Sequence, residues 1–397
     1  MEQLLQKVKE QAKNNLERVT TWRRHLHANP ELSFQEVETG KFISRVLTDA
    51  GIEHTHGVAE NGVVALIKGK NPESRTIALR ADMDALPITE INTIDYKSRK
   101  EGVMHACGHD VHSASLLGAA HILEELKEEF SGTVKLIFQP AEEKMPGGAS
   151  IMIKEGVLEN PAPEVIFGQH VHPPLEVGKV GMRPGMYMAS ADELYLTVKG
   201  QGGHGALPQD CLDPILLMSH IIIALQQVVS RRADPTIPTV LTIGKINSEG
   251  GSTNVIPNAV HAMGTFRTMN EDWRMRAHEL IRETVEGVAK SMGGEAQLRI
   301  VKGYPFLVND ADETHAARQF AIEYLGEENV VELPIRMTAE DFSYYSQQIP
   351  GCFYRLGTGN KAKGITSPVH TNTFNIDEAA LEWGAGLMAW MAIRKLV

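Results

Sequence analysis

The segment from His105 to His112 concentrates side chains that bind metals. It holds three histidines, one cysteine and one aspartate within eight residues, and each of these groups binds divalent cations once deprotonated. Cys107 and His109 are two residues apart, so an extended loop would point both side chains to one side. Helical spacing of apolar residues from Ser113 to Phe130 then predicts that the cluster lies at a helix entrance. A single cysteine is more often a small buried apolar residue, so this segment alone does not decide the matter.

Further acidic and histidine residues follow predicted strands. The runs 76–80, 133–139 and 165–168 read as strands, and they are followed by the pairs Asp82/Asp84, Glu142/Glu143 and His170/His172. Strands and helices alternate here, which predicts a mostly parallel sheet with helices on both faces. Sites form at the carboxyl edge of such sheets, so we expect the three pairs to converge near the Cys107 segment.

Each of these groups also has a plain structural interpretation. Adjacent glutamates are usually a solvated surface pair, but Glu142 and Glu143 follow a buried-looking strand and a proline. Two neighbouring carboxylates in different environments suit different roles, one as a metal ligand and one as a proton carrier. Asp82 and Asp84 fit helix caps or anchors behind metal ligands as well as ligands themselves.

The chain predicts two domains. Residues 187–298 read strand, helix, strand, strand, helix, strand, which is a ferredoxin-like α+β order. We therefore assign 1–186 and 299–397 to a discontinuous metal-binding catalytic domain of the α/β class, with three α/β/α layers. The inserted domain, 187–298, is the predicted lid and dimerisation domain.

Composition excludes several partners. The chain has 397 residues and a net charge of −11, which argues against nucleic acid or an anionic membrane as a partner. We expect no membrane span, because no apolar run approaches the roughly 20 residues that a bilayer requires. Three cysteines and a charged N-terminal stretch predict a reducing, cytoplasmic location.

The turn from Gly200 to Gly205 matches a dinucleotide-binding pattern, G-x-G-x-x-G. We reject that function, because Pro208 and a polar stretch intervene before any helix could meet a phosphate. A histidine inside the turn, His204, would also crowd a pyrophosphate. The structural interpretation is a tight turn that exposes His204.

Seven short motifs occur in a fixed order along nearly the whole chain. They are RADMDALP (80–87), HACGHD (105–110), QPAEE (139–143), GQHVHP (168–173), GGHGA (202–206), NVIP (254–257) and VHT (369–371). The set resembles the M20 metallopeptidase family, and more narrowly the amidohydrolase branch that cleaves N-acyl amino acids, hippurate-type amides and auxin conjugates. Relatives commonly carry Pro-His after the Gly-Ala of the fifth motif, whereas this chain has Pro208-Gln209. The resemblance therefore does not specify the residues at the rim of the substrate site.

The resemblance implies a role for each matching residue. It implies a dinuclear site with two divalent ions per subunit and the ligands Cys107, His109, Glu143, His170 and His370. Glu142 would be the general base, and His204 would stabilise the oxyanion, within its own subunit or across a dimer. Asn254 and Arg267 would bind the substrate, and Asp82, Asp84 and Asp110 would stand behind the ligands.

The expected activity is hydrolysis of N-acyl amino acids to a carboxylate and a free amino acid, by a homo-oligomer. One thiolate and three imidazoles favour Zn, Ni or Co over Mn, whereas the related branch is associated with Mn, so the metal stays open. Two rivals remain: a di- or tripeptidase of the same superfamily, and an inactive binding protein on the same scaffold. Cys107 argues against the peptidase branches, which carry aspartate there, and the intact Glu142 argues against the inactive protein.

Overall fold

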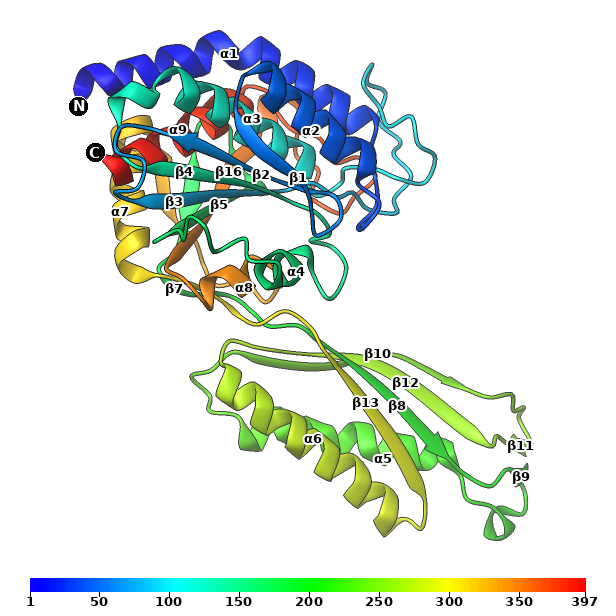
Figure 1. Ribbon diagram of the computed structural model, residues 1–397. Helices are drawn as coiled ribbons and strands as arrows, with labels where there is room; N and C mark the ends of the chain where they lie inside the picture. Colours follow the sequence, from blue (N-terminus) through cyan, green and yellow to red (C-terminus); the bar gives the residue numbers. More distant parts are fainter. The chain divides into compact units, whose positions relative to one another are not determined.

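An eight-stranded mixed sheet forms the centre of the first of two units in the computed structural model, which describes residues 1–397 (Figure 1). This unit comprises Met1–Gly185, Val308–Pro334 and Asp341–Val397. The strand order is β1-β2-β4-β3-β5-β16-β6-β15. The strands are β1 (Glu53–Val58), β2 (Gly62–Lys68), β3 (Thr76–Asp82), β4 (Thr133–Gln139), β5 (Ile166–Glu176), β6 (Val180–Met182), β15 (Val330–Glu332) and β16 (Gly351–Gly359).

Helices cover both faces of this sheet, which makes three α/β/α layers (Figure 1). One face is covered by the group that includes the mutually packed α1, α3 and α9, and the other by α4 and α8. The helices are α1 (Glu2–Ala28), α2 (Val37–Asp49), α3 (His109–Glu125), α4 (Gly148–Lys154), α7 (Ala311–Leu325), α8 (Ser343–Ser346) and α9 (Ala380–Leu396), with short 3-10 turns η1 (Lys127–Glu129), η4 (Glu327–Asn329) and η5 (Lys361–Lys363).

Double coverage explains the sequences of the central strands. Every residue of β3, β4 and β16 is buried, as expected of strands that contact helices on both sides. β3 pairs in parallel with β4 and β5, and β5 pairs in parallel with β16. The carboxyl ends of β3 and β4 therefore lie next to each other, level with the middle of β5.

The second unit, Met186–Leu307 with Ile335–Glu340, has the predicted ferredoxin-like order. Its antiparallel sheet runs β10-β12-β8-β13, and α5 and α6 pack on that sheet through one apolar core. The elements are β8 (Asp192–Lys199), β9 (Gly203–His204), η2 (Pro208–Asp210), α5 (Pro214–Gln227), η3 (Val228–Arg232), β10 (Thr239–Ser248), β11 (Val255–Ile256), β12 (Ala259–Thr268), α6 (Glu271–Ser291) and β13 (Glu295–Lys302).

The second unit extends beyond the boundary drawn at residue 298. β13 continues to Lys302, and the unit ends at Leu307. The unit boundaries fall within two short strands, β7 (Gly185–Met188) and β14 (Leu307–Asn309). The boundary differs because β13, the last strand of the ferredoxin-like sheet, pairs with β8 along the full length of β8.

Three local predictions were wrong. The helix predicted from Ser113 begins at His109, because Gly108 takes a left-handed φ of 85° and turns the chain directly into the helix. His170 and His172 lie inside β5, which continues to Glu176, rather than after its end. β16 was missed, because its glycines and polar residues hide the strand pattern although it is buried throughout.

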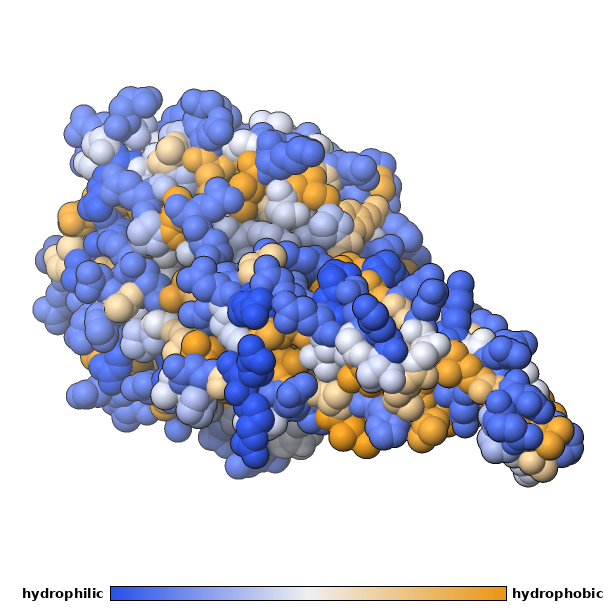
Figure 2. Space-filling view, turned by 90° about the horizontal axis from the view of Figure 1, so that it is seen from below, coloured by the Kyte–Doolittle hydropathy of each residue, from blue (hydrophilic) through white to orange (hydrophobic).

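One segment, Pro214–Arg232, is long and apolar enough to cross a membrane by length and composition, contrary to the sequence-based expectation. Its inner face belongs to the core of the second unit through Leu217, Ile221 and Leu225, and a core helix passes the same test. Its outer face exposes Ile215, Leu216 and Ile223. Figure 2 shows apolar surface patches interspersed with polar atoms on the face that it draws.

Candidate metal centre

The pairing of β3, β4 and β5 brings the predicted pairs of acidic and histidine residues close to one another. Asp82, the last residue of β3, is paired with Gln139 at the end of β4. Arg80 is paired with Gly168 of β5, so His170 stands level with Asp82 two residues later. Glu142 and Glu143 follow β4 by a few residues, and His109 opens α3. The parallel sheet thus collects side chains that are far apart in the sequence.

Two groups of metal-ligating atoms share the thiol of Cys107. The first consists of Cys107, His109 and His170, and the second of Cys107, Glu143 and His370; within each group the ligating atoms lie within 4.8 Å of one another. The Sγ of Cys107 is 3.4 Å from Nε2 of His170 and 3.2 Å from Nε2 of His370. The structure therefore brings together all five residues that the resemblance implied as ligands.

Two of the three imidazoles in the ligand groups, those of His109 and His170, are oriented through their other nitrogen. Nδ1 of His109 lies 3.0 Å from Asp84, and Nδ1 of His170 lies 2.8 Å from the carbonyl oxygen of Val171. This leaves Nε2 of His109 buried without a hydrogen bond. A carboxylate or carbonyl behind the ligand is the usual arrangement around metal-binding histidines. A buried, unpaired nitrogen facing a thiol and carboxylates fits a divalent cation.

The electrostatics of the centre also fit a cation. Burial acts to lower the pKa of His109, but Asp82 and Asp84 raise it to about 10. Burial raises the pKa of the Cys107 thiol well above its usual value, and Glu143 and Glu142 raise it further. The centre therefore has an excess of negative charge that favours positive charge, and metal binding would release the thiol proton.

Asp84 is the hydrogen-bonding hub behind the ligands. It is buried, and besides His109 its carboxylate accepts hydrogen bonds from the backbone N–H groups of Glu142 and Glu143, at 3.1 and 3.0 Å. Ser33 donates a further hydrogen bond of 2.6 Å. Burial raises the pKa of Asp84, but its hydrogen bonds, led by that from His109, hold the pKa below 3.8. Asp84 thus fixes His109 and both glutamates at once.

Asp82 and Asp110 support the centre in different ways. Asp82 contacts Nδ1 of His112 at 2.5 Å and accepts a hydrogen bond from buried Arg80 at 2.6 Å. Nε2 of His112 in turn accepts a hydrogen bond from the N–H of Val171, beside His170. Asp110 accepts a hydrogen bond from buried Arg23, a residue of α1, at 2.8 Å. Asp110 therefore anchors the first turn of α3 to α1.

Glu142 lies beside the ligand groups. Its side chain is largely buried. One of its carboxylate oxygens, a carboxylate oxygen of Glu143 and a ring nitrogen of His109 lie within 4.8 Å of one another. Its Oε1 accepts a 3.4 Å hydrogen bond from the N–H of Asp341. The preceding residue, Ala141, has a positive φ of 52° and donates its N–H to Glu36 at 2.7 Å. This strained turn aims two adjacent carboxylates at one centre.

Sequence reasoning missed several supports of the centre. Ser33, Glu36 and Asp341 each hold a residue of the site. Asp341 accepts hydrogen bonds from Gln139 and from the N–H of Ala149, and it contacts Arg80 at 2.7 Å. No spacing or composition around Asp341 distinguishes it from a surface acid, because its partners come from distant parts of the chain.

The residues predicted to bind substrate lie in the second unit. His204 in β9 pairs with Val255 in β11, and the N–H of Gly205 donates to the carbonyl of Asn254. His204 and Asn254 are therefore neighbours, and both are exposed. Arg267 lies near the far end of β12, where its guanidinium donates a 3.1 Å hydrogen bond to the carbonyl of Met337. The second unit thus brings His204 to Asn254 but not to Arg267.

Comparison with known proteins places the chain in a family. The family model for peptidase family M20/M25/M40 matches residues 78–394. The chain belongs to this family. Across 392 residues it is 38% identical to thermostable carboxypeptidase 2 of Saccharolobus solfataricus, with 97% of this chain and 98% of the relative covered.

Two further M20 relatives bear on the branch and on the metal. N-acetylcysteine deacetylase of Bacillus subtilis is 39% identical over 377 residues, which covers 95% of this chain and 96% of the relative. The crystal structure of Bacillus subtilis YXEP, described as a dinuclear metal-binding peptidase from the M20 family, has a TM-score of 0.82 and 36% identity. It covers 97% of this chain and 99% of that one. This M20 chain is therefore a hydrolase of the amidohydrolase branch with ligand groups for divalent metal.

Proposed function

We propose that this M20 hydrolase cleaves the amide bond of N-acyl amino acids with two divalent cations per subunit. The observation that carries the proposal is the pair of ligand groups that share the Cys107 thiol. His109 and His170 would complete one group, and Glu143 and His370 the other. When bound, such ions polarise an amide carbonyl and make water a better nucleophile near neutral pH.

Glu142 is the proposed general base. It takes a proton from the attacking water as the oxygen bonds to the amide carbon, and it then delivers that proton to the leaving amine nitrogen. Its position beside the ligand groups, with its backbone N–H fixed by Asp84, supports this role. Glu143 shares the same anchor but belongs to a ligand group.

Arg267 is the proposed partner of the amino-acid carboxylate. No carboxylate of the chain forms an ion pair with its half-buried guanidinium, and burial lowers its pKa below the usual value for arginine. A planar guanidinium suits bidentate binding of a carboxylate. An arginine that is partly removed from water and lacks an acidic partner is ready to bind an anionic substrate.

The second unit supports a shared site in a dimer. β12 pairs with β8 from Ala259 opposite Lys199 to Phe266 opposite Asp192. His204 and Asn254 lie beyond the Ala259 end, so Arg267 is roughly 26 Å along the strand from that end. A small N-acyl amino acid cannot bridge that distance. We therefore infer that a substrate held by Arg267 meets His204 and Asn254 of a second copy.

A peptidase function is the second candidate. The similarity to thermostable carboxypeptidase 2 favours it, because a carboxypeptidase removes a carboxyl-terminal residue from a peptide. Cleavage of a peptide bond and of an N-acyl amide needs the same base and cations, and both substrates carry a carboxylate for Arg267. The two functions differ in what precedes the scissile bond, an acyl group or an amino acid with a free amine.

A substrate panel separates the candidates. Purified protein is assayed with N-acetyl and N-benzoyl amino acids and with dipeptides of the same residues, before and after chelation, alongside elemental analysis. We expect a higher kcat/KM on the acyl amino acids, loss of activity with chelator, and recovery with Zn, Co, Ni or Mn. A clear preference for dipeptides would reject the proposed substrate class, and unchanged activity in a metal-free sample would reject the cations.

We also propose a cytoplasmic location. The three cysteines, Cys107, Cys211 and Cys352, form no disulfide. A centre that depends on a free thiol keeps its function best in a reducing compartment. Periplasmic or secreted protein on cell fractionation would contradict this location.

A further inference from the structure

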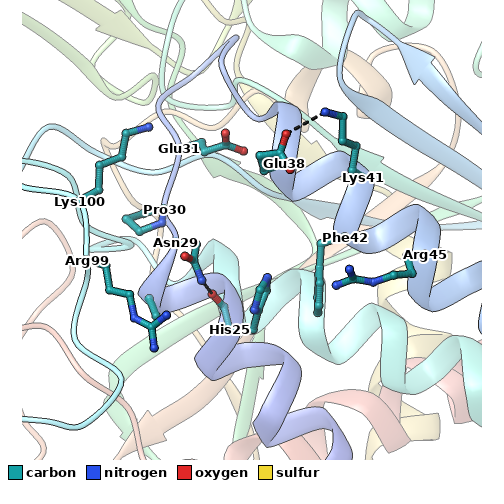
Figure 3. A pocket seen from close by; sticks show the side chains of 11 residues that line it. His25, Asn29, Pro30, Glu31, Glu38, Lys41, Phe42, Arg45, Arg99 and Lys100 are labelled. Carbon is teal, nitrogen blue, oxygen red and sulfur yellow. Dashed lines mark hydrogen bonds and ion pairs between the residues drawn. The ribbon is translucent and has the colours of Figure 1, made fainter.

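A basic pocket lies in the first unit, lined by none of the proposed metal ligands (Figure 3). Its volume is about 640 Å³, which is in the range of small-molecule sites. The walls come from the end of α1, from α2 and from the loop at Arg99 and Lys100. Figure 3 shows these side chains arranged around one open space.

Positive charge dominates the pocket wall. Four cationic side chains line it, Lys41, Arg45, Arg99 and Lys100, against two carboxylates. Lys41 is paired with one carboxylate, that of Glu38, at 2.8 Å. Arg45, Arg99 and Lys100 form no ion pair. In a chain with a net charge of −11, this local excess is opposite in sign to the whole molecule.

The second carboxylate, that of Glu31, is already used by the fold. Its Oε2 accepts hydrogen bonds from the N–H and the hydroxyl of Thr39, at 2.8 and 2.9 Å, in the first turn of α2. Its backbone carbonyl accepts a hydrogen bond from Ala85 at 2.8 Å. Glu31 is therefore directed at α2 and forms no ion pair with the arginines, although its negative charge still counts in the pocket wall.

The floor of the pocket is formed by packed aromatic rings that carry no charge. The His25 ring stacks on Phe42 with a centroid distance of 4.2 Å and an interplanar angle of 21°. Arg45 lies over the same Phe42 ring, 5.4 Å from its centroid. Burial lowers the pKa of His25, and the charges of Arg45 and Arg99 lower it further, so the ring adds no charge at neutral pH. Backbone hydrogen bonding of Arg99 to Ala28, at 2.9 Å, fixes the loop against α1.

We propose that this pocket binds a small dianionic molecule, either a dicarboxylate or a phosphate monoester, separately from the metal centre. Arg45, Arg99 and Lys100 would each contact the anionic groups, because charge-assisted hydrogen bonds from such side chains bind carboxylates and phosphates. Two positive charges remain after the two carboxylates are counted, which matches a dianion. The fixed walls reduce the ordering that binding requires.

Calorimetry of the metal-loaded protein with succinate, glycerol 2-phosphate and uncharged succinamide tests the proposal. We expect one equivalent of a dianion to bind per pocket, with no binding of succinamide. The tighter of the two dianions identifies the ligand class. Arg45→Gln with Arg99→Gln should weaken that binding by about tenfold or more, and added salt should weaken it as well.

Two further variants make the result specific. Lys13→Gln with Arg18→Gln removes the same charge from exposed positions on α1 outside the pocket and should bind as the parent protein does. Lys100→Glu alters only an exposed loop residue and should also weaken binding, which keeps the test valid if the double arginine variant fails to fold. Equal affinity in parent, pocket and control proteins, or no binding of either dianion up to about 50 mM, overturns the proposal.

Discussion

At the scale of single residues, the centre depends on what lies behind each ligand as much as on the ligands. His109 has the right chemistry for a metal, but Asp84 determines which of its nitrogens faces Cys107. The same aspartate fixes the backbone of Glu142 and Glu143. The proposed base Glu142 and the proposed ligand Glu143 are therefore held by the same carboxylate.

The two glutamates make a matched test of these roles. Glu142→Gln should lower kcat by about 10²–10⁴-fold, because the side chain can no longer accept a proton, while the metal content stays that of the parent. Glu143→Gln should instead lower the metal content, because it removes a charged ligand from the group with Cys107 and His370. Steady-state kinetics and elemental analysis of both proteins check this. If Glu142→Gln keeps the parent kcat, Glu142 is not the base.

Residue chemistry was the most predictable part of the protein. Cys107, His109 and Glu143 could be proposed as ligands from the sequence, because metal ligands must be particular residue types and the short motifs that contain them are recognisable. Ser33, Glu36 and Asp341 were not visible, because a hydrogen bond to a distant backbone group leaves no local pattern. The sequence therefore predicts which atoms do chemistry better than it predicts what holds them.

At the scale of elements, the turn from Cys107 into α3 is the tightest point of the centre. Gly108 has a φ of 85°, and a Cβ there would lie 2.5 Å from a methyl group of Val171. Val171 follows the proposed ligand His170 in β5. A side chain at position 108 must therefore displace either the start of α3 or the strand that carries His170.

Gly108→Ala should lower both Tm and metal content. Gly102→Ala is the control, since Gly102 has a similar φ of 74° but no atom within 4 Å of its added Cβ. Backbone strain alone should cost the control about 1 kcal/mol, with the metal content unchanged. Gly108→Ala with Val171→Ala should recover part of the metal content because the clash is removed. Equal losses in Gly102→Ala and Gly108→Ala would show that strain, not the clash, is responsible.

The second unit has its own buried ionic network, which links β8 to α6. Asp192 accepts a hydrogen bond from buried Arg274 at 2.9 Å, and its carboxylate contacts His278 at 2.7 Å. The N–H of Gly303, just after β13, donates to the same carboxylate at 3.1 Å. Burial raises the pKa of Asp192, but Arg274 and His278 hold it below the usual 3.8.

Asp192→Asn should destabilise the second unit by about 3–5 kcal/mol at pH 7, because it removes the buried counterion of Arg274 and leaves only the less buried Glu271. The folded pKa lies below the unfolded one, so the carboxylate contributes stability above pH 3.8 that is lost as the pH falls through the folded pKa. The difference from the parent should therefore shrink below about pH 4. Urea unfolding between pH 3 and 7 measures it. Glu271→Gln, which changes the half-exposed partner of Arg274, should cost less; an equal cost would contradict the argument.

Elements were predictable where amphipathic or buried patterns are long. β4 has the expected bounds, 133–139, because an apolar run specifies it. The start of α3 and the length of β5 were wrong, because His109, His170 and His172 occupy positions where apolar residues would mark the element. β16 was hidden for a related reason, since it pairs through its backbone while carrying glycine at three of its nine positions. Tertiary pairing, not local pattern, specifies that strand.

At the scale of the whole molecule, the second unit of one chain does not bring together the residues that are proposed to contact the substrate. Arg267 and the pair His204 and Asn254 lie at opposite ends of the second unit's sheet. α5 also exposes Ile215, Leu216 and Ile223 on its outer face. A second copy would explain both features, since it could cover apolar side chains and present its own His204. The sequence left this point open, because strand register fixes the distance and motif order does not.

Subunit mixing tests the shared site directly. His204→Ala and Glu142→Gln proteins, each inactive alone, are co-expressed with different tags and the mixed dimers are isolated. If His204 acts across the dimer, one of the two sites in each mixed dimer has both residues intact, so the isolated mixed dimers should show about half of the parent activity. If His204 acts within its own chain, every site lacks one residue and activity stays at the level of the separate variants.

Arg267→Ala mixed with Glu142→Gln is the control, because both residues are proposed to serve the same chain's substrate and no recovery is expected. Recovery in the control, or none with His204→Ala, would contradict the shared site, and a protein that sediments only as a monomer would exclude it.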